Sequence, residues 1–296
     1  MATIDITTVR APMRILGFRW PFHGVIANGV IGFLLFFVFL AIFGEFISPY
    51  APNRVGVGPA LAPPSPQFWF GTDGLGRDQL SRVIASTRPA LLSATEAVSL
   101  ALVVGLAIGI AAGYLGGWWD GALSRIMDLL FAFPEYLLAI LVVAVLGSGL
   151  TNVAIGVGII CIPRFARAAR SATMEVISRG YVEAAVLAGR SRAWIMWRHV
   201  LPNIASPLLV MTAITLSTAE GAYASLAFLG FGERPPTADL GSMISAAQPY
   251  MTTNPFTVLF PAAVFVVLVL AFNVLGDVLR DLLDPRARPE LARSIR

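Results

Sequence analysis

The sequence contains several long stretches of apolar residues without a single charge. Residues 25–43 form the first of these stretches, and residues 256–275 form the last. A helix that crosses a bilayer needs about 20 mostly apolar residues, and its backbone N–H and C=O groups bond to each other because lipid offers them no partner. The stretches therefore predict an all-α integral membrane protein.

Taken together, these stretches predict six transmembrane helices. A content of 57% hydrophobic and 13% charged residues excludes an ordinary soluble protein. The first stretch is longer than the apolar region of a secretory signal peptide, which has about 7–15 residues, so we interpret it as a permanent anchor. The single Cys161 excludes an internal disulfide. The predicted helices lie at 25–47, 97–115, 126–145, 153–169, 204–226 and 256–275.

The distribution of arginine predicts how the chain is oriented. The helices divide it into a cytoplasmic N-terminal segment, the first helix, an extracytoplasmic loop that includes GTDGLGRD, a transmembrane core and a cytoplasmic tail, at 1–24, 25–47, 48–92, 93–284 and 285–296. Of the 21 arginines, 16 fall in segments that this arrangement places inside and 5 in segments that it places outside. Because cytoplasmic loops are enriched in basic residues, we expect both termini and the loop at 180–203 to be cytoplasmic.

A few charged residues lie in or beside the predicted helices. Asp128 and Glu135 flank Pro134 in the third helix, and we assign them to structure near the membrane interface rather than to a proton relay. Three arginines at the end of the fourth helix are expected to face lipid head groups or a cytoplasmic partner: Arg164, Arg167 and Arg170.

Glu220 is the charged residue that lies deepest in an apolar stretch. A carboxylate in such a position faces either a polar partner or a watery cavity. Two interpretations follow from the sequence, a structural hydrogen bond near the outer end of the fifth helix and a contact with a transported substrate. We predict an intramembrane polar contact at Glu220, and the sequence leaves both interpretations open.

The mixed polar and apolar segment 180–203 lies between two uncharged stretches. Residues 181–188 are good helix formers, with Glu183 near the start where the helix dipole favours a negative charge. Gly189 stands where a helix ends in the left-handed conformation, and Pro202 stands where the next helix begins. Small side chains at Ala184, Ala185 and Ala188 leave room for a partner. The segment is interpreted as a docking element of two short helices, the alternative being an ordinary loop.

The sequence contains no lysine. All 21 of its Lys and Arg positions are arginine. A phosphate-binding loop of the Walker A type requires a lysine, so the chain does not bind and hydrolyse ATP in that way. Lysine Schiff-base chemistry is excluded for the same reason. His23 and His199 are far apart in sequence and suggest no metal site. In a membrane protein the basic charge marks cytoplasmic loops, so no nucleic-acid partner is expected.

Glu183-Ala184-Ala185, followed by Gly189 and by Leu201-Pro202, resembles the EAA loop of ABC-importer permeases. His199 stands where that family has isoleucine. The segment FGTDGLGRDQLSR at 70–82 is similar to the stretch before the second helix in DppC/OppC-type permeases of peptide importers, and we expect it to form a tight turn and a helix start rather than an ion site. The AFLGFG stretch at 227–232, after Glu220, and the C-terminal residues 270–286 also resemble that branch.

The resemblance covers nearly the whole chain and implies the type I (MetI-like) importer permease fold, with an extra N-terminal helix and a cytoplasmic coupling helix. It implies a transport subunit in a prokaryotic cytoplasmic membrane that is not itself an enzyme and binds no cofactor. ATP and Mg would be bound by one or two separate ATPase subunits, which contact the EAA loop residues Tyr181, Glu183, Ala184, Ala185, Gly189, Leu201 and Pro202.

The other implied partners are a DppB/OppB-like second permease, an extracytoplasmic peptide-binding protein and membrane lipid. Di- or oligopeptides are the expected substrates. Two alternatives stay open at this point. One is an ABC permease for nickel or another small solute, and the other is a secondary transporter driven by an ion gradient, although the sequence has no obvious internal repeat of the kind that such transporters contain.

Overall fold

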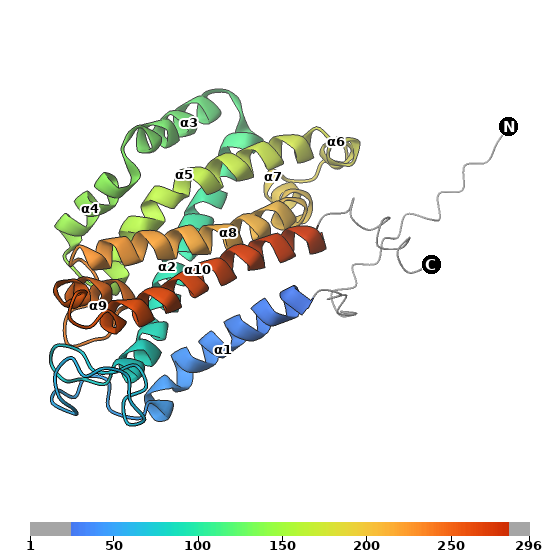
Figure 1. Ribbon diagram of the computed structural model, residues 1–296. Coiled ribbons are helices and arrows are strands. Elements are labelled where there is room, and N and C mark those ends of the chain that lie inside the picture. The colour runs from blue at the N-terminus through green and yellow to red at the C-terminus, as the bar shows by residue number, and fades with distance from the viewer. Residues whose placement is uncertain (1–24, 284–296) are drawn as a thin grey trace, which may run out of the picture.

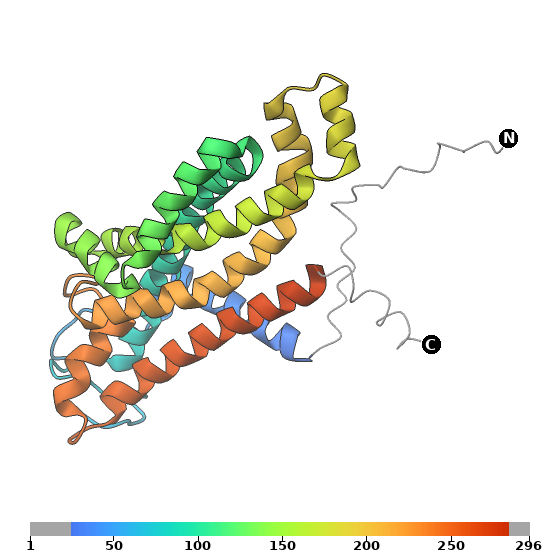
Figure 2. The same ribbon diagram turned by 90° about the horizontal axis from the view of Figure 1, so that it is seen from above.

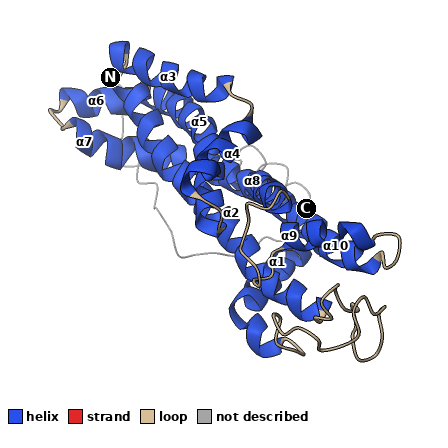
Figure 3. Ribbon diagram, turned by 90° about the vertical axis from the view of Figure 1, so that its left-hand side faces the viewer, coloured by secondary structure: helices blue, strands red, loops and turns tan. Residues whose placement is uncertain are grey.

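A computed structural model describes residues 25–283, with side chains from 28 to 280. Over this range the chain consists of helices and loops, as Figure 3 shows. The expected segments 1–24 and 285–296 lie outside the described residues. In chain order the elements are α1 (Val25–Ile47), α2 (Gln79–Leu115), α3 (Gly117–Ala132), α4 (Glu135–Leu146), α5 (Leu150–Ile177), α6 (Gly180–Leu187), α7 (Arg192–Ile195), the π-helical turn η2 (Met196–Val200), α8 (Leu201–Phe228), α9 (Leu240–Ala247), the 3-10 turn η3 (Gln248–Tyr250) and α10 (Phe256–Leu283).

Five of the described helices are long and apolar enough to cross a membrane, and a sixth crossing results if α3 and α4 are counted as one. These two helices are bent by 93° at the break between them. The sequence predicts one kinked helix at 126–145, whereas the structure has a broken one. The reason is local, because Phe133 and Pro134 both have extended ψ angles near the break and proline supplies no N–H to continue the helix.

Helix α2 begins at Gln79, inside the range 48–92 that the sequence assigns to a loop. Asp78 caps it, because its Oδ2 accepts hydrogen bonds from the N–H and the Oγ–H of Ser81 at 2.8 and 2.6 Å. The preceding turn is closed by Asp73, whose Oδ1 accepts the N–H groups of Leu75 and Arg77. This confirms the expected tight turn and helix start, with Asp73 bonded to its own loop.

The most extensive helix packing joins α2 to α5. Gly105, Gly109 and Gly113 repeat at four-residue spacing on one face of α2, and each lies against the backbone of α5. A Cβ atom placed on Gly109 would lie 2.4 Å from the carbonyl oxygen of Ala166. Small residues at this spacing allow two helices in lipid to approach backbone to backbone, so the prediction of close packing from the glycine repeat is confirmed.

The bundle has two distinct ends (Figure 1). The start of α1, the end of α10 and the α6–α7 segment lie together at one end, and α9 with the loop after α1 lies at the other. Seen from above in Figure 2, α6 and α7 extend beyond the neighbouring helices as a separate hairpin. Gly149 and Phe231 join two loops at the α9 end through a backbone hydrogen bond of 3.1 Å.

We predict that Gly109→Ala destabilises the protein, because the added methyl group meets the backbone of α5 and neither helix can yield without separating. The expected loss is about 1–3 kcal/mol of unfolding free energy, measured as a lower Tm of the purified protein in detergent. Gly221→Ala is the matched control, since a Cβ at Gly221 in α8 meets nothing within 4 Å. Equal Tm values for the two variants would contradict the packing argument.

Candidate functional site

Helix α6 is a single short helix that ends in a defined cap at Gly189. The N–H of Gly189 donates to the carbonyl of Val186 at 2.9 Å, and the N–H of Arg190 donates to the carbonyl of Ala185 at 3.1 Å. This pair of bonds is the Schellman motif, which requires a left-handed residue after the helix. Gly189 has φ +72°, so the expected helix-ending role is confirmed. Glu183 lies in the first turn of α6, also as expected.

The segment after Gly189 folds back through α7 and η2. The Ser191 hydroxyl caps α7 by accepting the N–H of Trp194 at 3.3 Å. His199 lies between two aromatic rings, with its ring centroid 5.5 Å from that of Tyr181 and 5.1 Å from that of Trp194. The guanidinium of Arg190 lies 4.9 Å from the centre of the Trp194 ring. The histidine that replaces the family's isoleucine thus links α6 to η2.

One side of this hairpin is anchored in the protein core. Val182, Ile195 and Val200 are buried, from α6, α7 and η2 respectively, and they belong to the same hydrophobic cluster as the buried residues of α5 and α8. Ala185 and Leu201 are half-buried beside them. An eight-residue helix is too short to be stable alone, so these contacts hold α6 in place.

The opposite side of the hairpin exposes large apolar groups. The side chain of Leu187 is 83% exposed and that of Trp197 is 74% exposed. Tyr181, Val186 and Trp194 add further exposed apolar surface. Large apolar side chains exposed on one small element are typical of an interaction site. The remaining residues of the predicted docking set, Glu183, Ala184, Gly189 and Pro202, are exposed as well.

At the membrane-facing side of the hairpin, Arg179 precedes α6. It donates a hydrogen bond of 2.8 Å to Glu175 Oε1, and this bond raises the pKa of the Arg179 guanidinium above its usual value. Pro202 lies in the first turn of α8, where a missing N–H is tolerated. The sequence therefore predicted the end of α6 at Gly189 and the start of the next helix near Pro202, and missed the aromatic contacts.

Glu220 lies apart from this hairpin, toward the other end of α8. Its side chain is buried, and its Oε2 accepts a hydrogen bond of 3.3 Å from the Ser93 hydroxyl of α2, whereas its Oε1 has no partner. A second buried contact lies close by, because Tyr223 donates a hydrogen bond of 2.5 Å to Asp239 at the start of α9. The geometry agrees with the structural interpretation of Glu220, a polar contact between α2 and α8.

The sequence suggested that the arginines at 164, 167 and 170 face lipid head groups or a cytoplasmic partner, and within the chain they have acidic partners. Each makes an ion pair with an acidic residue of the α3–α4 segment, as described below. The acidic residues of these ion pairs lie 29 to 50 residues away from their arginines in the sequence, which is why local spacing did not reveal them.

Comparison with known proteins identifies the family. Residues 105–289 match the family model "Binding-protein-dependent transport system inner membrane component". The chain belongs to this family. It is 44% identical over 257 residues, 86% of this chain and 85% of the relative, to the glutathione transport system permease protein GsiD of Escherichia coli O6:K15:H31 (strain 536 / UPEC). The GsiD protein of Shigella boydii serotype 4 (strain Sb227) has the same identity and coverage.

Two groups of solved structures share the fold. The inward-facing MetNI methionine ABC transporter matches with a TM-score of 0.56 at 19% identity, covering 69% of this chain and 96% of the solved chain. An amino acid ABC transporter crystallised with histidines matches with a TM-score of 0.53 at 18% identity, covering 68% and 94%. These likenesses confirm the MetI-like fold, and the additional helix α1 precedes the region that the family model covers.

The protein is therefore a multi-pass inner-membrane permease of an ABC importer, related to the DppC/OppC-type permeases. It is a membrane transport subunit. Membership of the family implies a second permease, ATPase subunits and an extracytoplasmic binding protein. Membership of this family also excludes the alternative of a secondary transporter driven by an ion gradient.

We predict that Gly189→Ala disturbs the end of α6, because an alanine in the left-handed conformation costs about 1 kcal/mol or more. The expected result is faster proteolysis or hydrogen exchange at residues 180–200 with little change in overall Tm. Gly180→Ala is the matched control, since Gly180 lies at the other end of the same helix, has no positive φ and would give a Cβ nothing within 4 Å. Protection that is the same in both variants would contradict the cap.

We also predict that Glu220→Gln is at least as stable as the wild type. The amide keeps a hydrogen-bond acceptor for Ser93 and removes the possibility of an unpaired buried charge. Glu220→Ala leaves a cavity and is expected to lower the unfolding free energy by about 2 kcal/mol or more. The Tm of the three proteins in detergent tests this, and a Glu220→Gln variant as unstable as Glu220→Ala would show that the ionised carboxylate itself is needed.

Proposed function

We propose that this permease imports di- or oligopeptides across the cytoplasmic membrane by alternating access, and that separate ATPase subunits drive it through the α6–α7–η2 hairpin. The observation that carries the proposal is the exposed apolar surface of this hairpin. Leu187 and Trp197 lie at the end of the bundle where α1 begins and α10 ends. The exposed side offers a partner surface to bind, and the buried side connects it to the transmembrane helices.

The coupling follows from how the hairpin is attached. In the proposed cycle, ATP and Mg bound at the ATPase subunits bring those subunits together, and the hairpin moves with them. Val182, Ile195 and Val200 join it to the core, so the movement is passed to α5 and α8. ATP drives the cycle only if it favours one conformation of the assembly over the other. Release of the binding protein's peptide and hydrolysis of ATP then complete the cycle.

The proposed orientation places the hairpin and both termini in the cytoplasm. The arginine distribution supports it, because the positive-inside rule concerns loops close to the helix ends and Arg179, Arg190, Arg192 and Arg198 cluster in or beside the hairpin. The α9 end, with the 48–78 segment, then faces the extracytoplasmic binding protein. A membrane-impermeant label on cysteines at 181–188 in intact cells tests this orientation, which would be wrong if the label reacted from outside.

The relatives support a peptide as the substrate. The GsiD proteins are named as permeases for glutathione, which is a tripeptide derivative, and the match covers most of both chains. The experiment is co-purification of the chain with its ATPase and second permease, followed by ATP turnover with the binding protein and added peptides. Stimulation by peptides supports the proposal. Stimulation by nickel and not by peptides would replace it with the small-solute alternative.

We predict that Leu187→Ser weakens the association with the ATPase subunits. Burying a leucine side chain at an interface stabilises it by about 2 kcal/mol, so the loss corresponds to about 30-fold weaker binding. The measurement is ATPase recovered with the tagged permease, together with uptake. The matched control is Val55→Ser, because Val55 is 60% exposed but lies in the loop at the opposite end. Normal ATPase recovery with Leu187→Ser would show that the hairpin is not the binding site.

A further inference from the structure

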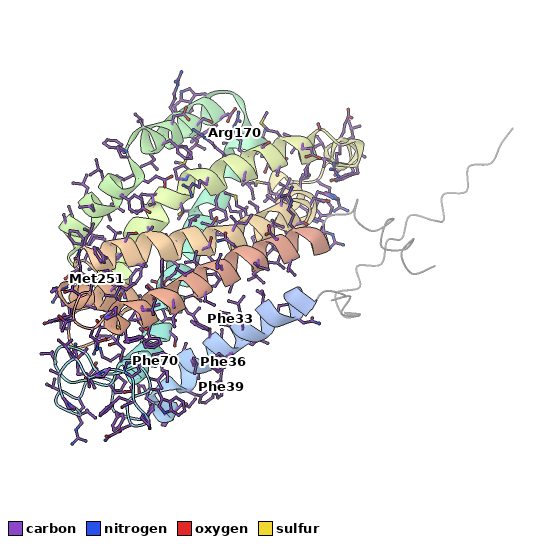
Figure 4. The ribbon with its side chains drawn as sticks, in the orientation of Figure 1. Phe33, Phe36, Phe39, Phe70, Arg170 and Met251 are labelled. Carbon is purple, nitrogen blue, oxygen red and sulfur yellow. The ribbon has the colours of Figure 1, made fainter. Side chains whose placement is uncertain are left out.

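Three ion pairs connect α5 to the broken α3–α4 segment. The Arg170 guanidinium pairs with Asp120, with Nη2 donating to Oδ2 at 2.6 Å, and Arg167 Nη2 donates to Asp128 Oδ1 at 2.8 Å. Figure 4 shows Arg170 between α3 and α5. The third pair joins Arg164 to Glu135 in the first turn of α4. We call this row of three pairs the ion-pair ladder.

The ladder begins well inside the membrane-spanning part of the bundle. An α-helix rises about 1.5 Å per residue, so Arg164 lies about 21 Å along α5 from Leu150, and Arg170 lies about 30 Å along it. A hydrocarbon core is about 30 Å thick. If α5 enters the bilayer near Leu150, the Arg164–Glu135 pair is inside the hydrocarbon layer and the Arg170–Asp120 pair is at its inner boundary.

The ladder is exposed on the surface of the isolated chain. The side chains of Arg167 and Asp128 are 56% and 52% exposed, and those of Arg164 and Glu135 are 33% and 46% exposed. Charged groups at this depth are costly against lipid, and in membrane proteins they face the bundle interior or a water-filled cavity. A break in a membrane helix is likewise tolerated only where it is covered by protein or lines such a cavity, and the 93° break lies beside Glu135.

A hollow beside the ladder favours water over a covering protein. It has a volume of about 330 Å³ and lies between α2, α3 and α5. A cavity holds water where polar groups offer the water several hydrogen-bond partners, and polar side chains line this cavity. Its lining includes Ser124, Asp128, Arg167 and Arg170, together with Ile108 and Met127.

We propose that the face of α3, α4 and α5 that carries the ion-pair ladder is this subunit's wall of the aqueous translocation path, and that Glu135 and Arg164 contact the ionic ends of the passing solute. The inference rests on the proposed function, which supplies a peptide as solute. At neutral pH a peptide has an ammonium at one end and a carboxylate at the other. Fixed charges of both signs offer each end a partner, while their pairing with one another prevents tight retention of the solute.

The first test measures access of water to this face in the assembled transporter. Ala132 is exposed on α3, one helical turn after Asp128 and on the same face. Ala132→Cys is made in a Cys161→Ala background, because Cys161 is a free cysteine in the described chain. The matched control is Ala263→Cys, which is exposed in the uncharged part of α10. A charged methanethiosulfonate reagent, added to both sides of the membrane, is expected to label Ala132→Cys at least tenfold faster.

Two results of this labelling would overturn the proposal. If a lipid-soluble maleimide labels both positions and the charged reagent labels neither, the ladder faces lipid. If Ala132→Cys reacts in the isolated chain but with neither reagent in the complete transporter, another subunit covers the ladder. This readout does not require peptide transport, so it stands even if the solute is not a peptide.

The second test measures charge selectivity. Glu135→Gln removes one negative charge from the path and is expected to raise the ratio of acidic to basic peptide uptake about 16-fold, because one unit charge at about 5 Å in water changes the uptake of each peptide about fourfold, in opposite directions. Glu175→Gln is the matched control, because Glu175 is also paired with an arginine but lies at the end of α5 beside the hairpin. An unchanged ratio in Glu135→Gln, or an equal change in both variants, would overturn the contact with the solute.

Discussion

The close packing of α2 against α5 is the interaction on which the other features depend. Gly105, Gly109 and Gly113 let the two backbones meet, and this fixes α5 in both position and rotation. The rotation decides which residues of α5 face α3 and α4, and hence where the ion-pair ladder forms. The position decides where α5 ends, and the hairpin begins only three residues after Ile177. Without this contact, neither feature would have a defined place.

The hairpin illustrates how a weak helix gains a defined structure, on which its proposed role in binding depends. An eight-residue helix has little stability of its own, and three local devices compensate: the cap at Gly189, the ring contacts of His199 with Tyr181 and Trp194, and the buried anchors Val182 and Ile195. Val186, Leu187 and Trp197, which take no part in these devices, are left exposed. A surface built in this way is rigid before a partner arrives, which reduces the ordering entropy that binding must offset.

Features encoded by local sequence could be predicted, and features that depend on distant residues could not. The glycine repeat predicted helix packing, Gly189 predicted the end of α6, and Pro202 predicted the start of α8. The start of α2 was missed because residues 79–96 are too polar to resemble a membrane span. Their hydroxyls are satisfied within the helix, as when Ser86 donates to the Val83 carbonyl at 2.7 Å. The ion pairs were missed because each joins residues on separate helices.

The arrangement also explains how a movement at the hairpin reaches the membrane interior without a special pathway of residues. Along α5, only about 10 Å separates Arg170 from Ile177, and the glycine contact with α2 lies beside the same stretch. In the proposed cycle, a force on the hairpin would tilt α2 and α5 together, because their backbones are in contact. The ladder is carried by the same helix, so a small tilt changes the spacing between α5 and the less constrained α3–α4 segment. The paired helices α2 and α5, packed beside the broken α3–α4 segment, are therefore sufficient for the proposed coupling between the hairpin and the ion-pair ladder.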